Sequence, residues 1–376
     1  MLRSMDLLER REFVAREFGV DWSKLATSDN LEMVGKIENP IGLMPLPLGL
    51  VGPMRVQFPE AKMAEFYVPL VTNEACLLAS VNRGAKLTGE FGVELVIEYV
   101  GVNRAPVFKC ASPIAASQNA KFIEGKFAEI KEIFEQNSKH TKLLSVTTKV
   151  TEQFLHVMFY ADTDEAMGMN MVTIAAKRVI DQFILEKCPL AISLVAESGN
   201  FCSDKKASLV NVANGRGYKV KAVTKLADWQ LAELEVTQES LLDIYQAKLC
   251  LGSELAQAIG KNCHQANMLA AFYAATGQDL AHVVDGATGS TEVSIAGKDV
   301  VFSVDLPCLL VGSIGGGLNL PQVKEVLKIM KIKPGVAGEA AKLAGLAAAT
   351  VLCGEVSLLL ALAQARLASS HEKARA

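Results

Sequence analysis

The order in which the hydrophobic period changes between residues 105 and 196 constrains the fold of this chain more than any other feature. Apolar residues alternate where a strand is expected, and they recur every three or four positions where a helix is expected. The segment predicts strand, helix, strand, strand, helix and strand over residues 106–110, 122–136, 142–150, 154–160, about 165–183 and 190–196. This βαββαβ order is that of the ferredoxin-like split βαβ unit, so we predict a small lobe of this kind.

The rest of the chain predicts a larger lobe around this unit. With 376 residues, half of them hydrophobic, the chain can bury a large core and divide into two or more lobes. Residues 1–42 predict a small, mainly polar helical region, whereas the flanking segments are richer in Gly, Ala and Leu. We therefore predict an α+β fold: a large helix-rich domain over 43–105 and 208–376, an inserted ferredoxin-like domain over 106–197 and a connecting loop over 198–207.

Charge and cysteine usage exclude several classes of protein. Lys and Arg number 38 against 41 Asp and Glu, and there is no Lys- or Arg-rich run and no zinc-finger spacing, so we expect no nucleic-acid partner. The eight cysteines form no CxxC pair, which is typical of a reducing compartment. Residues 1–24 show an amphipathic pattern without the apolar core of a signal peptide, so we expect a cytoplasmic protein.

One apolar stretch, residues 343–363, is about as long as a bilayer span. It contains Glu355, and Ala is its commonest residue, which favours a tightly packed helix inside a soluble protein over a transmembrane span. We expect no membrane association.

Residues 162–171 (DTDEAMGMNM) are the first candidate for a ligand site. The glycine-rich GxGxxG pattern of a Rossmann domain is absent, and residues 312–317 have the wrong spacing for it. Instead, Thr163 or Asp164 could cap a helix whose first turn Gly168 leaves bare for the phosphates or amide of a ligand. An ordinary capped helix fits the same residues.

Residues 198–206 (SGNFCSDKK) are the second candidate, because a predicted strand ends there and two adjacent lysines follow a carboxylate. A solvated loop fits them equally well. None of the five histidines has a second possible ligand at metal-binding spacing, so we expect no metal.

Together these two segments resemble the cofactor and substrate loops of the 3-hydroxy-3-methylglutaryl-CoA (HMG-CoA) reductase family. Other motifs of that family follow in order between residues 30 and 371, and the first of them resembles its dimerisation motif. They lie at 38–42 (ENPIG), 45–47 (PLP), 52–53 (GP), 72–76 (TNEAC), 82–84 (NRG), 103–107 (NRAPV), 277–279 (GQD), 315–320 (GGGLNL) and 370–371 (SH). The resemblance implies that the large domain binds HMG-CoA and the small one NADP(H).

The resemblance implies a reduction of HMG-CoA to mevalonate and CoA with two NADPH, through a hemithioacetal and mevaldehyde. Lys205 would stabilise the oxyanion formed by hydride addition, because a fixed cation in a dry site does this better than water. His371 would protonate the departing CoA thiolate, and Glu74 would give a proton to the final alkoxide. Asp279 would share a proton network with Lys205 and Glu74. Taken alone, Glu74 and Asp279 could be helix caps, and His371 a surface histidine.

The resemblance also implies residues that hold the substrate and the cofactor. The substrate-binding set is Arg104, Ser198, Asp204, Lys206, Lys248 and Asn267. The cofactor-binding set is Ser138, Lys139, Glu165, Met167, Gly168, Met169 and Asn170. In another context these would be routine surface residues, and His264 is expected to be an ordinary helix residue.

The choice of cofactor depends on how the 2′-phosphate of NADPH is held. Residues 138–140 (Ser-Lys-His) form a basic, hydroxyl-bearing patch that favours NADPH over the alternative, NADH. The same patch could be the charged end of a helix. Glu165 departs from the family, which usually has Asp there. The chain ends five residues after His371, which resembles the shorter, soluble, class I-like form.

The resemblance further implies a homodimer or homotetramer with active sites between subunits. Two other functions remain open at this point. The same fold could oxidise mevalonate with NAD. From a different class, the chain could be a CoA-thioester hydrolase or acyltransferase that uses Cys76 or Cys202 with His371.

Overall fold

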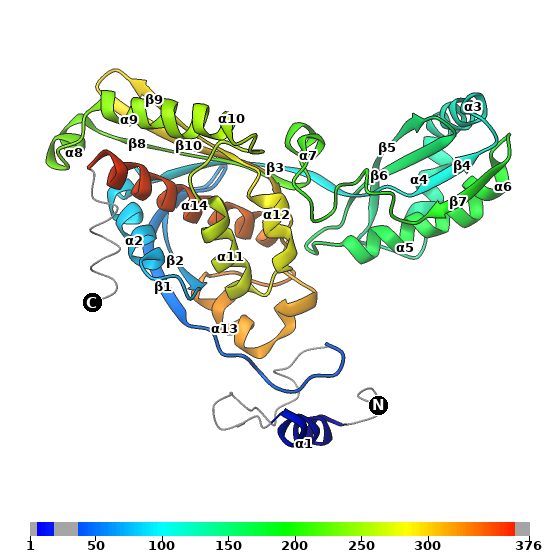
Figure 1. The fold of residues 1–376 in the computed structure, drawn as a ribbon, viewed down its shortest axis with the longest axis horizontal. Helices are drawn as coiled ribbons and strands as arrows, with labels where there is room; N and C mark the ends of the chain where they lie inside the picture. The colour runs from blue at the N-terminus through cyan, green and yellow to red at the C-terminus, as the bar shows by residue number, and fades with distance from the viewer. Residues whose placement is uncertain (1–5, 19–36, 365–376) are drawn as a thin grey trace.

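The structure is a computed structural model that describes residues 6–18 and 37–364. It shows a mixed fold of helices and a largely antiparallel sheet, arranged in a larger and a smaller lobe (Figure 1). Each lobe has its own hydrophobic core, and a small third cluster of Ala105, Met158 and Cys202 is separate from both.

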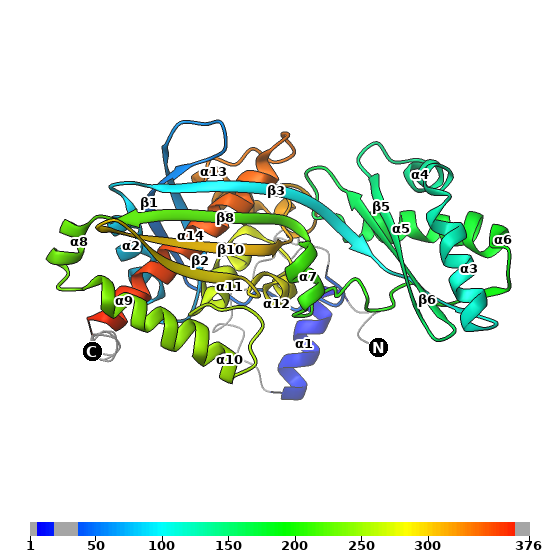
Figure 2. The same cartoon turned by 90° about the horizontal axis from the view of Figure 1, so that it is seen from above.

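Strand β3 (Val93–Arg104) runs through both lobes and joins them (Figure 2). Its first part pairs with β8 (Gly217–Leu226) in the larger lobe. Its last three residues pair with β6 (Phe154–Asp162) in the smaller lobe. Gly101, with a φ of 87°, is the last residue paired with β8, and a Cβ on it would lie 2.9 Å from the carbonyl oxygen of Ala161. Arg104 is thereby placed at the junction of the lobes.

The smaller lobe is an antiparallel sheet of strand order β7-β4-β6-β5 with helices packed on it. Its elements are β4 (Val107–Cys110), α3 (Pro113–Glu124), α4 (Phe127–Glu135), β5 (Lys142–Thr151), β6, α5 (Met169–Val179), the π-helical turn η4 (Ile180–Ile184), α6 (Leu185–Lys187) and β7 (Ile192–Ala196). The order of strands and helices along the chain is the predicted one, except that two helices, α3 and α4, stand where one was expected. Helix α3 begins where Ser112 caps it, with the Ser112 Oγ accepting from Ala115 N at 3.1 Å.

The second predicted helix begins later than expected. The sequence predicted a start near Glu165 with Thr163 or Asp164 as the cap, but α5 starts at Met169 and the preceding residue is Gly168. Gly168 has a φ of 80°, and a Cβ on it would lie 2.3 Å from the Thr163 side chain. Thr163 does not cap the helix because its Oγ donates to Ala166 O at 2.8 Å.

The larger lobe is organised around one long apolar helix, α14 (Glu339–Ala363). In the described part of the chain it is the one helix long and apolar enough to cross a bilayer, and 83% of its most apolar window is buried. Gly84 of α2 (Leu77–Thr88) packs directly on it, since a Cβ there would lie 1.9 Å from Cys353 O. Helix α14 is thus a buried core helix, as its alanine content predicted.

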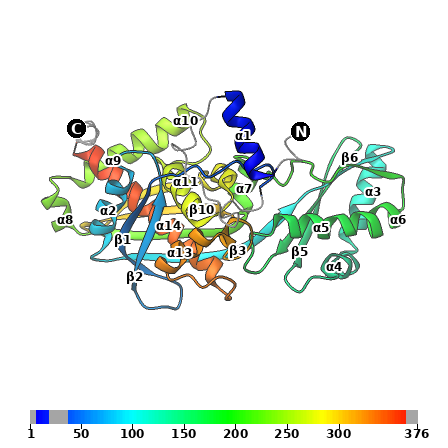
Figure 3. The ribbon, with the colours of Figure 1, turned by 90° about the horizontal axis from the view of Figure 1, so that it is seen from below.

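Several other elements of the larger lobe contact this helix, namely α2, α9, α11, β1, β3, β8 and β10. Strands β1 and β2 form an antiparallel pair that packs near α2 and α13 (Figure 3). Strands β9 and β10 extend the sheet beyond β8. The bounds are α1 (Leu7–Phe18), β1 (Leu48–Gln57), β2 (Ala64–Val71), α7 (Leu209–Asn214), α8 (Asp228–Glu233), α9 (Gln238–Ile244), η5 (Tyr245–Gly252), α10 (Ser253–Leu255), α11 (Gln265–Thr276), η6 (Leu280–His282), α12 (Val283–Gly286), β9 (Ser290–Ala296), β10 (Asp299–Leu309), η7 (Gly316–Asn319) and α13 (Pro321–Ile329).

Candidate active site

The loop between β7 and α7 carries four of the predicted site residues, Ser198, Asp204, Lys205 and Lys206. Lys205 has a φ of 57°, a left-handed backbone conformation that is unfavourable for residues other than glycine. Such backbone conformations are maintained by surrounding contacts. Here the Lys205 amide donates to Asp285 Oδ2 at 3.3 Å, and Gly199 N donates to Ala105 O at 2.6 Å.

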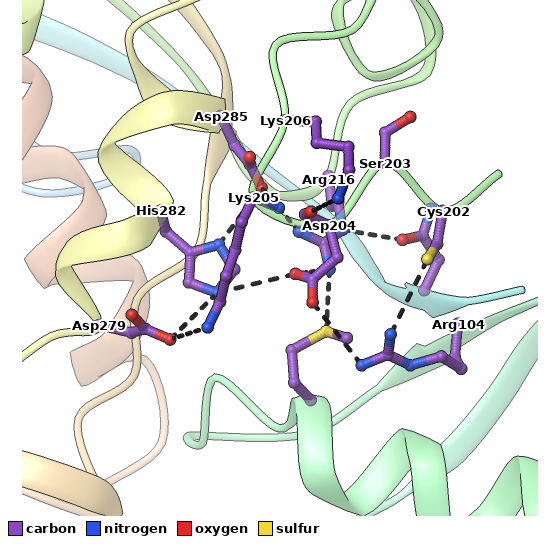
Figure 4. Close-up of polar contacts among 12 residues, drawn as sticks. Arg104, Cys202, Ser203, Asp204, Lys205, Lys206, Arg216, Asp279, His282 and Asp285 are labelled. Carbon is purple, nitrogen blue, oxygen red and sulfur yellow. Dashed lines mark hydrogen bonds and ion pairs between the residues drawn. The ribbon is translucent and has the colours of Figure 1, made fainter. Parts of the chain in front are cut away.

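The ammonium group of Lys205 lies 2.8 Å from Asp279 Oδ2 (Figure 4). Asp279 also accepts from Ala281 N at 3.1 Å, which starts the short helical turn η6. Gly277 places it there: Gly277 ends α11 at a φ of 65°, and a Cβ on it would lie 2.8 Å from the backbone of Gly317. Two of the predicted glycine-containing motifs, 277–279 and 315–320, therefore meet at this point.

The pKa of Asp279 is lowered from its ordinary value. Partial burial alone would raise it, but the hydrogen bonds from Lys205 and from the Ala281 amide, with the nearby His282 and Lys205 charges, act in the other direction and outweigh burial. The resting site therefore contains a carboxylate and an ammonium group in contact. The Lys205 side chain keeps 43% of its surface exposed, so its amine is accessible to a ligand.

Arg216 is a buried cation that the sequence reading missed. Its side chain is 0% exposed, and it contacts Asp285 Oδ2 at 2.8 Å, Asp204 Oδ1 at 2.9 Å and Asn103 Oδ1 at 2.8 Å. A buried charge of this kind is stable only when it is fully paired. Arg216 therefore holds Asp204 in place and fixes the loop that carries Lys205.

Arg104 connects the same loop to the smaller lobe. Its Nε donates to Thr173 Oγ1 of α5 at 3.0 Å, and its Nη1 donates to Ser198 Oγ at 3.0 Å. Asp204 Oδ2 lies 3.7 Å from its Nη2. Lys206 is exposed and reaches back to Asp204 O at 3.1 Å. The fold thus gathers six predicted residues: Arg104, Ser198, Asp204, Lys205, Lys206 and Asp279.

His282 lies in the same cluster, and it corrects one expectation from the sequence. Its Nδ1 is 3.2 Å from Asp285 Oδ2, and Asp204 is also close. His282, Asp204 and Asp285 could therefore, by distance, bind one metal ion. The guanidinium of Arg216 already contacts both carboxylates, however. A bound cation would be repelled by it, so the chemistry of this cluster is that of a charge network and not of a metal site.

A second group of predicted residues lies around the start of α11. Asn267 Nδ2 donates to Glu74 Oε1 at 3.2 Å. The backbone N–H of Glu74 donates to Thr72 Oγ1 at 2.9 Å. Glu74 is exposed in the turn before α2. Lys248 is exposed on η5, and its charge acts on the Cys263 thiol next to α11, although burial raises the pKa of that thiol.

Glu355 holds this second group in position and was not among the predicted site residues. It is 0% exposed within α14, and its carboxylate accepts from Cys263 N and His264 N, both at 2.8 Å, and from Thr291 Oγ1 at 2.7 Å. A negative charge at a helix N-terminus is favourable because the free amides point toward it. Glu355 therefore fixes the end of α11 from which Asn267 reaches Glu74.

The two groups lie at opposite ends of α11 within one chain. The nine steps from Asn267 to Thr276 rise about 13 Å along the helix axis, and Asp279 follows the last turn. Within this chain Asp279 contacts Lys205 and is beyond hydrogen-bond reach of Glu74. Within one chain Asp279 therefore lies beside Lys205 only, and its place beside Glu74 stays a prediction for the assembled enzyme.

The segment 162–170 supplies the start of α5. No side chain in the described chain caps the first turn of this helix, so the amides after Gly168 are available to a ligand. Asn170 is exposed, whereas Met167 packs on the core of the smaller lobe. Met169 is buried, and its Sδ lies 2.9 Å from Arg216 Nη2.

Glu165 does not face this ligand surface, which corrects its place among the predicted cofactor residues. It is 6% exposed, and its carboxylate accepts from Ser313 Oγ at 2.5 Å, Gly338 N at 2.6 Å and Ala340 N at 2.7 Å. These last two amides belong to the start of α14. The longer side chain of Glu reaches the N-terminus of the core helix, and its function here is structural.

The turn at 138–140 lies beside the segment that precedes α5. His140 Nδ1 is 2.8 Å from Asp164 Oδ2. Ser138 donates to Thr141 Oγ1 at 2.9 Å, and Lys139 is exposed. The basic patch and the segment 162–170 are thus neighbours in space. His371 lies outside the described residues.

Comparisons with known proteins agree on one family. The family model described as hydroxymethylglutaryl-coenzyme A reductase matches residues 6–376. The 3-hydroxy-3-methylglutaryl-coenzyme A reductase of Methanocaldococcus jannaschii is 36% identical over 375 residues, covering 97% of this chain and 91% of that protein. That of Haloferax volcanii is 39% identical over 340 residues, covering 89% and 83%.

A solved structure shows the same fold. The class II 3-hydroxy-3-methylglutaryl-CoA reductase of Streptococcus pneumoniae bound to NADPH superposes with a TM-score of 0.69 at 17% identity. The match covers 96% of this chain and 98% of that one.

Proposed function

The chain belongs to the hydroxymethylglutaryl-coenzyme A reductase family, and we propose that it reduces HMG-CoA to mevalonate and CoA with two NADPH. The observation that carries the proposal is the Lys205 ammonium, held 2.8 Å from Asp279 on a loop that also presents Ser198 and Arg104. A thioester reduction creates negative charge on the carbonyl oxygen, and this loop supplies the matching cation.

The residues of the chain perform the following tasks. Lys205 turns from Asp279 to the developing oxyanion, and its preorganised position makes that interaction stronger than one with water. Arg104 and Lys206 bind the negative charges of the substrate. Arg104 donates to Ser198 and Thr173, and the carboxylate of Asp204 lies 3.7 Å from it, beyond hydrogen-bond distance. Bound NADPH supplies the two hydrides. The uncapped amides after Gly168 and the exposed Lys139 fit its phosphates, so the donors at this site suit a phosphorylated dinucleotide.

We propose that the smaller lobe is the cofactor domain and the larger one the substrate domain. The uncapped start of α5 and the turn at 138–140 support the first assignment, because both lie on the smaller lobe. The connecting loop then brings the two ligands together at Lys205. The eight cysteines are free thiols, which supports a cytoplasmic location.

We propose that a complete site takes residues from two subunits. Glu74, Asn267 and Lys248 lie at the far end of α11 from Lys205 and Asp279, so one chain does not bring Glu74 to the reacting carbon. An exposed apolar run supports a subunit contact near Glu74, because its large side chains are 41–76% exposed before and within β1. This run consists of Ile41, Met44, Leu46, Leu48 and Leu50.

Mixing two inactive variants tests the shared site. Lys205→Ala and Glu74→Ala subunits, when unfolded together and reassembled, should regain activity because a mixed dimer contains one intact site. Random pairing gives about a quarter of the wild-type activity, since half of the dimers are mixed and each of those has one working site of two. Absence of recovery in a verified mixed dimer would refute the shared site without refuting the reductase activity.

The activity itself is tested by the stoichiometry of the reaction. Purified protein with HMG-CoA should oxidise two NADPH for each mevalonate formed, followed by the absorbance of the reduced nicotinamide. Release of CoA without nicotinamide oxidation would indicate a hydrolase instead. Cys202 is 0% exposed, which disfavours it as the nucleophile of such a hydrolase. A higher rate of mevalonate oxidation with NAD would favour the oxidative alternative.

A further inference from the structure

His282 is a fully buried imidazole with one ring nitrogen directed at the reacting groups. It is 0% exposed and lies three residues after Asp279 on η6. Its Nε2 is 3.8 Å from Asp279 Oδ2 and 4.0 Å from Asp204 Oδ1, and within the described chain this nitrogen has no hydrogen-bond partner. Buried nitrogens without a partner are rare in folded proteins, which points to a function.

Asp285 fixes the orientation of this ring. Asp285 Oδ2 lies 3.2 Å from His282 Nδ1, and the same oxygen accepts from Arg216 at 2.8 Å and from the Lys205 amide at 3.3 Å. A carboxylate at Nδ1 keeps a proton on that nitrogen and so fixes the tautomer of the ring. The neutral ring then presents a lone pair at Nε2 toward Asp279, and the charged ring presents an N–H.

The surroundings of His282 come from four parts of the fold (Figure 4). Asp279 and Asp285 belong to its own segment, Asp204 and Lys205 to the connecting loop, and Arg216 directly precedes β8. On α11, Tyr273 is close enough to Asp285 to be affected by its charge. Three carboxylates face the ring, against Lys205 and Arg216. While the Lys205 amine contacts Asp279, it neutralises part of the negative charge near the His282 ring. When the amine moves to a substrate, the net charge around the ring becomes more negative.

We propose that His282 is a positioning residue for Asp279 that also stores one proton for the reaction. The proposal rests on the reductase activity proposed above. When Lys205 leaves Asp279 for the oxyanion, the carboxylate loses its partner, and the Nε2–H of the His282 imidazolium takes its place. The Asp285 carboxylate then balances the ring.

The proton transfers balance in the following way. Each turnover adds two hydrides and consumes two protons, one at the CoA sulfur and one at the mevalonate alkoxide. In this proposal Lys205, and not Glu74 as the resemblance implied, gives the proton to the alkoxide. The N–H bond at His282 Nε2 then breaks, and Asp279 Oδ2 gains that proton and returns it to the Lys205 amine. His282 is left neutral with its Nδ1–H on Asp285. Asp279 is 36% exposed, so it can take a proton from solvent in the open site and restore the imidazolium.

The test compares His282→Gln with Tyr273→Phe. Glutamine can donate to Asp285 but does not titrate, so kcat should fall by about tenfold to a hundredfold, the lower part of the range for general acid–base catalysis. The KM for HMG-CoA should change little. The pH profile of kcat should lose an ionisation between about pH 5 and pH 8. Tyr273→Phe removes another fully buried titratable group, one affected by the charge of Asp285, and should leave the profile as in wild type.

A second measurement applies if His282→Gln does not fold. The chain has five histidines, so the ring signals of the wild-type enzyme can be assigned by NMR through substitution of the other four. In the complex with HMG-CoA and NADP⁺, the His282 ring should change protonation with pH. A ring that stays in one protonation state from about pH 5 to pH 9 would overturn the proposal, as would an active His282→Gln enzyme with an unchanged profile. A protein that does not oxidise NADPH with HMG-CoA at all would contradict the reductase function instead.

Discussion

Replacing Glu165 tests whether this residue belongs to the cofactor site or to the core. In the structure its carboxylate accepts from Ser313, Gly338 and Ala340, and the two backbone amides start α14. The alanine variant leaves three donors without their acceptor, at about 1–3 kcal/mol for each buried donor, and removes a helix-terminal charge contributing about 1 kcal/mol. Water can enter the space left by the side chain and restore part of the lost hydrogen bonding.

The expected loss of unfolding free energy is therefore roughly 3–5 kcal/mol for Glu165→Ala. For Glu165→Gln it should be about 2–3 kcal/mol. The single amide oxygen can accept from Ser313 and Ala340, but the amide nitrogen cannot accept from Gly338, and the charge is lost. Urea unfolding followed by far-UV circular dichroism measures both. The folded Gln variant should retain the wild-type KM for NADPH, since the side chain does not face the ligand.

The opposite result would show that the structural reading of Glu165 is wrong. In that case the unfolding free energy of the alanine variant would lie within about 1 kcal/mol of wild type, and the KM of the Gln variant for NADPH would rise at least tenfold. A valid comparison requires that Glu165→Asp is measured alongside. This substitution keeps the charge and shortens the reach by one methylene, so a loss of stability between the other two variants is expected.

Three further predictions concern the ends of α11 and the C-terminus. Glu355→Gln should lower the unfolding free energy by about 1–3 kcal/mol and reduce kcat, because Glu355 holds the amides next to Asn267; an unchanged kcat would count against this positioning role. Asp279 has a lowered pKa in the folded state, so its contribution to stability should be complete above about pH 4 and disappear as the pH falls further. A wild-type minus Asp279→Asn stability difference that grows toward acid would contradict this sign. His371→Ala should impair reduction of HMG-CoA more than reduction of free mevaldehyde, measured as NADPH oxidation, and equal losses would argue against a role in protonating CoA.

The fold of the smaller lobe could be predicted from sequence because its strands and helices differ in hydrophobic period. The prediction missed α3, whose buried face is made largely of alanines at 115, 116 and 120, so the apolar contrast of its faces is weak. The Ser112-Pro113 start signal would have identified it. The start of α5 was placed four residues too early, because a glycine in a left-handed conformation interrupts the segment after a plausible cap.

The site was predictable only in part, because several of its residues are far apart in the sequence and meet only in the folded chain. Motif resemblance identified Lys205 and Asp279, and the structure brings them into contact. Arg216, His282 and Asp285 share no local pattern, and their importance arises from contacts between three separate segments. Glu165 illustrates the reverse case, since a residue inside a recognised motif has its side chain buried in the core. The separation of Glu74 from Asp279 depends on the direction of α11, which no spacing in the sequence specifies.

The rate of hydride transfer in Lys205→Ala is the most direct test of the mechanism. A single turnover with pre-bound HMG-CoA and NADPH, followed by nicotinamide absorbance, should be slower than wild type by about a hundredfold to a thousandfold. The melting temperature should remain the same within about 2 °C, because the side chain is partly exposed and packs in no hydrophobic core of the described chain. Lys206→Ala, the matched neighbour, should mainly raise the KM for HMG-CoA. A Lys205→Ala enzyme that transfers hydride at nearly the wild-type rate would contradict the role given to this amine.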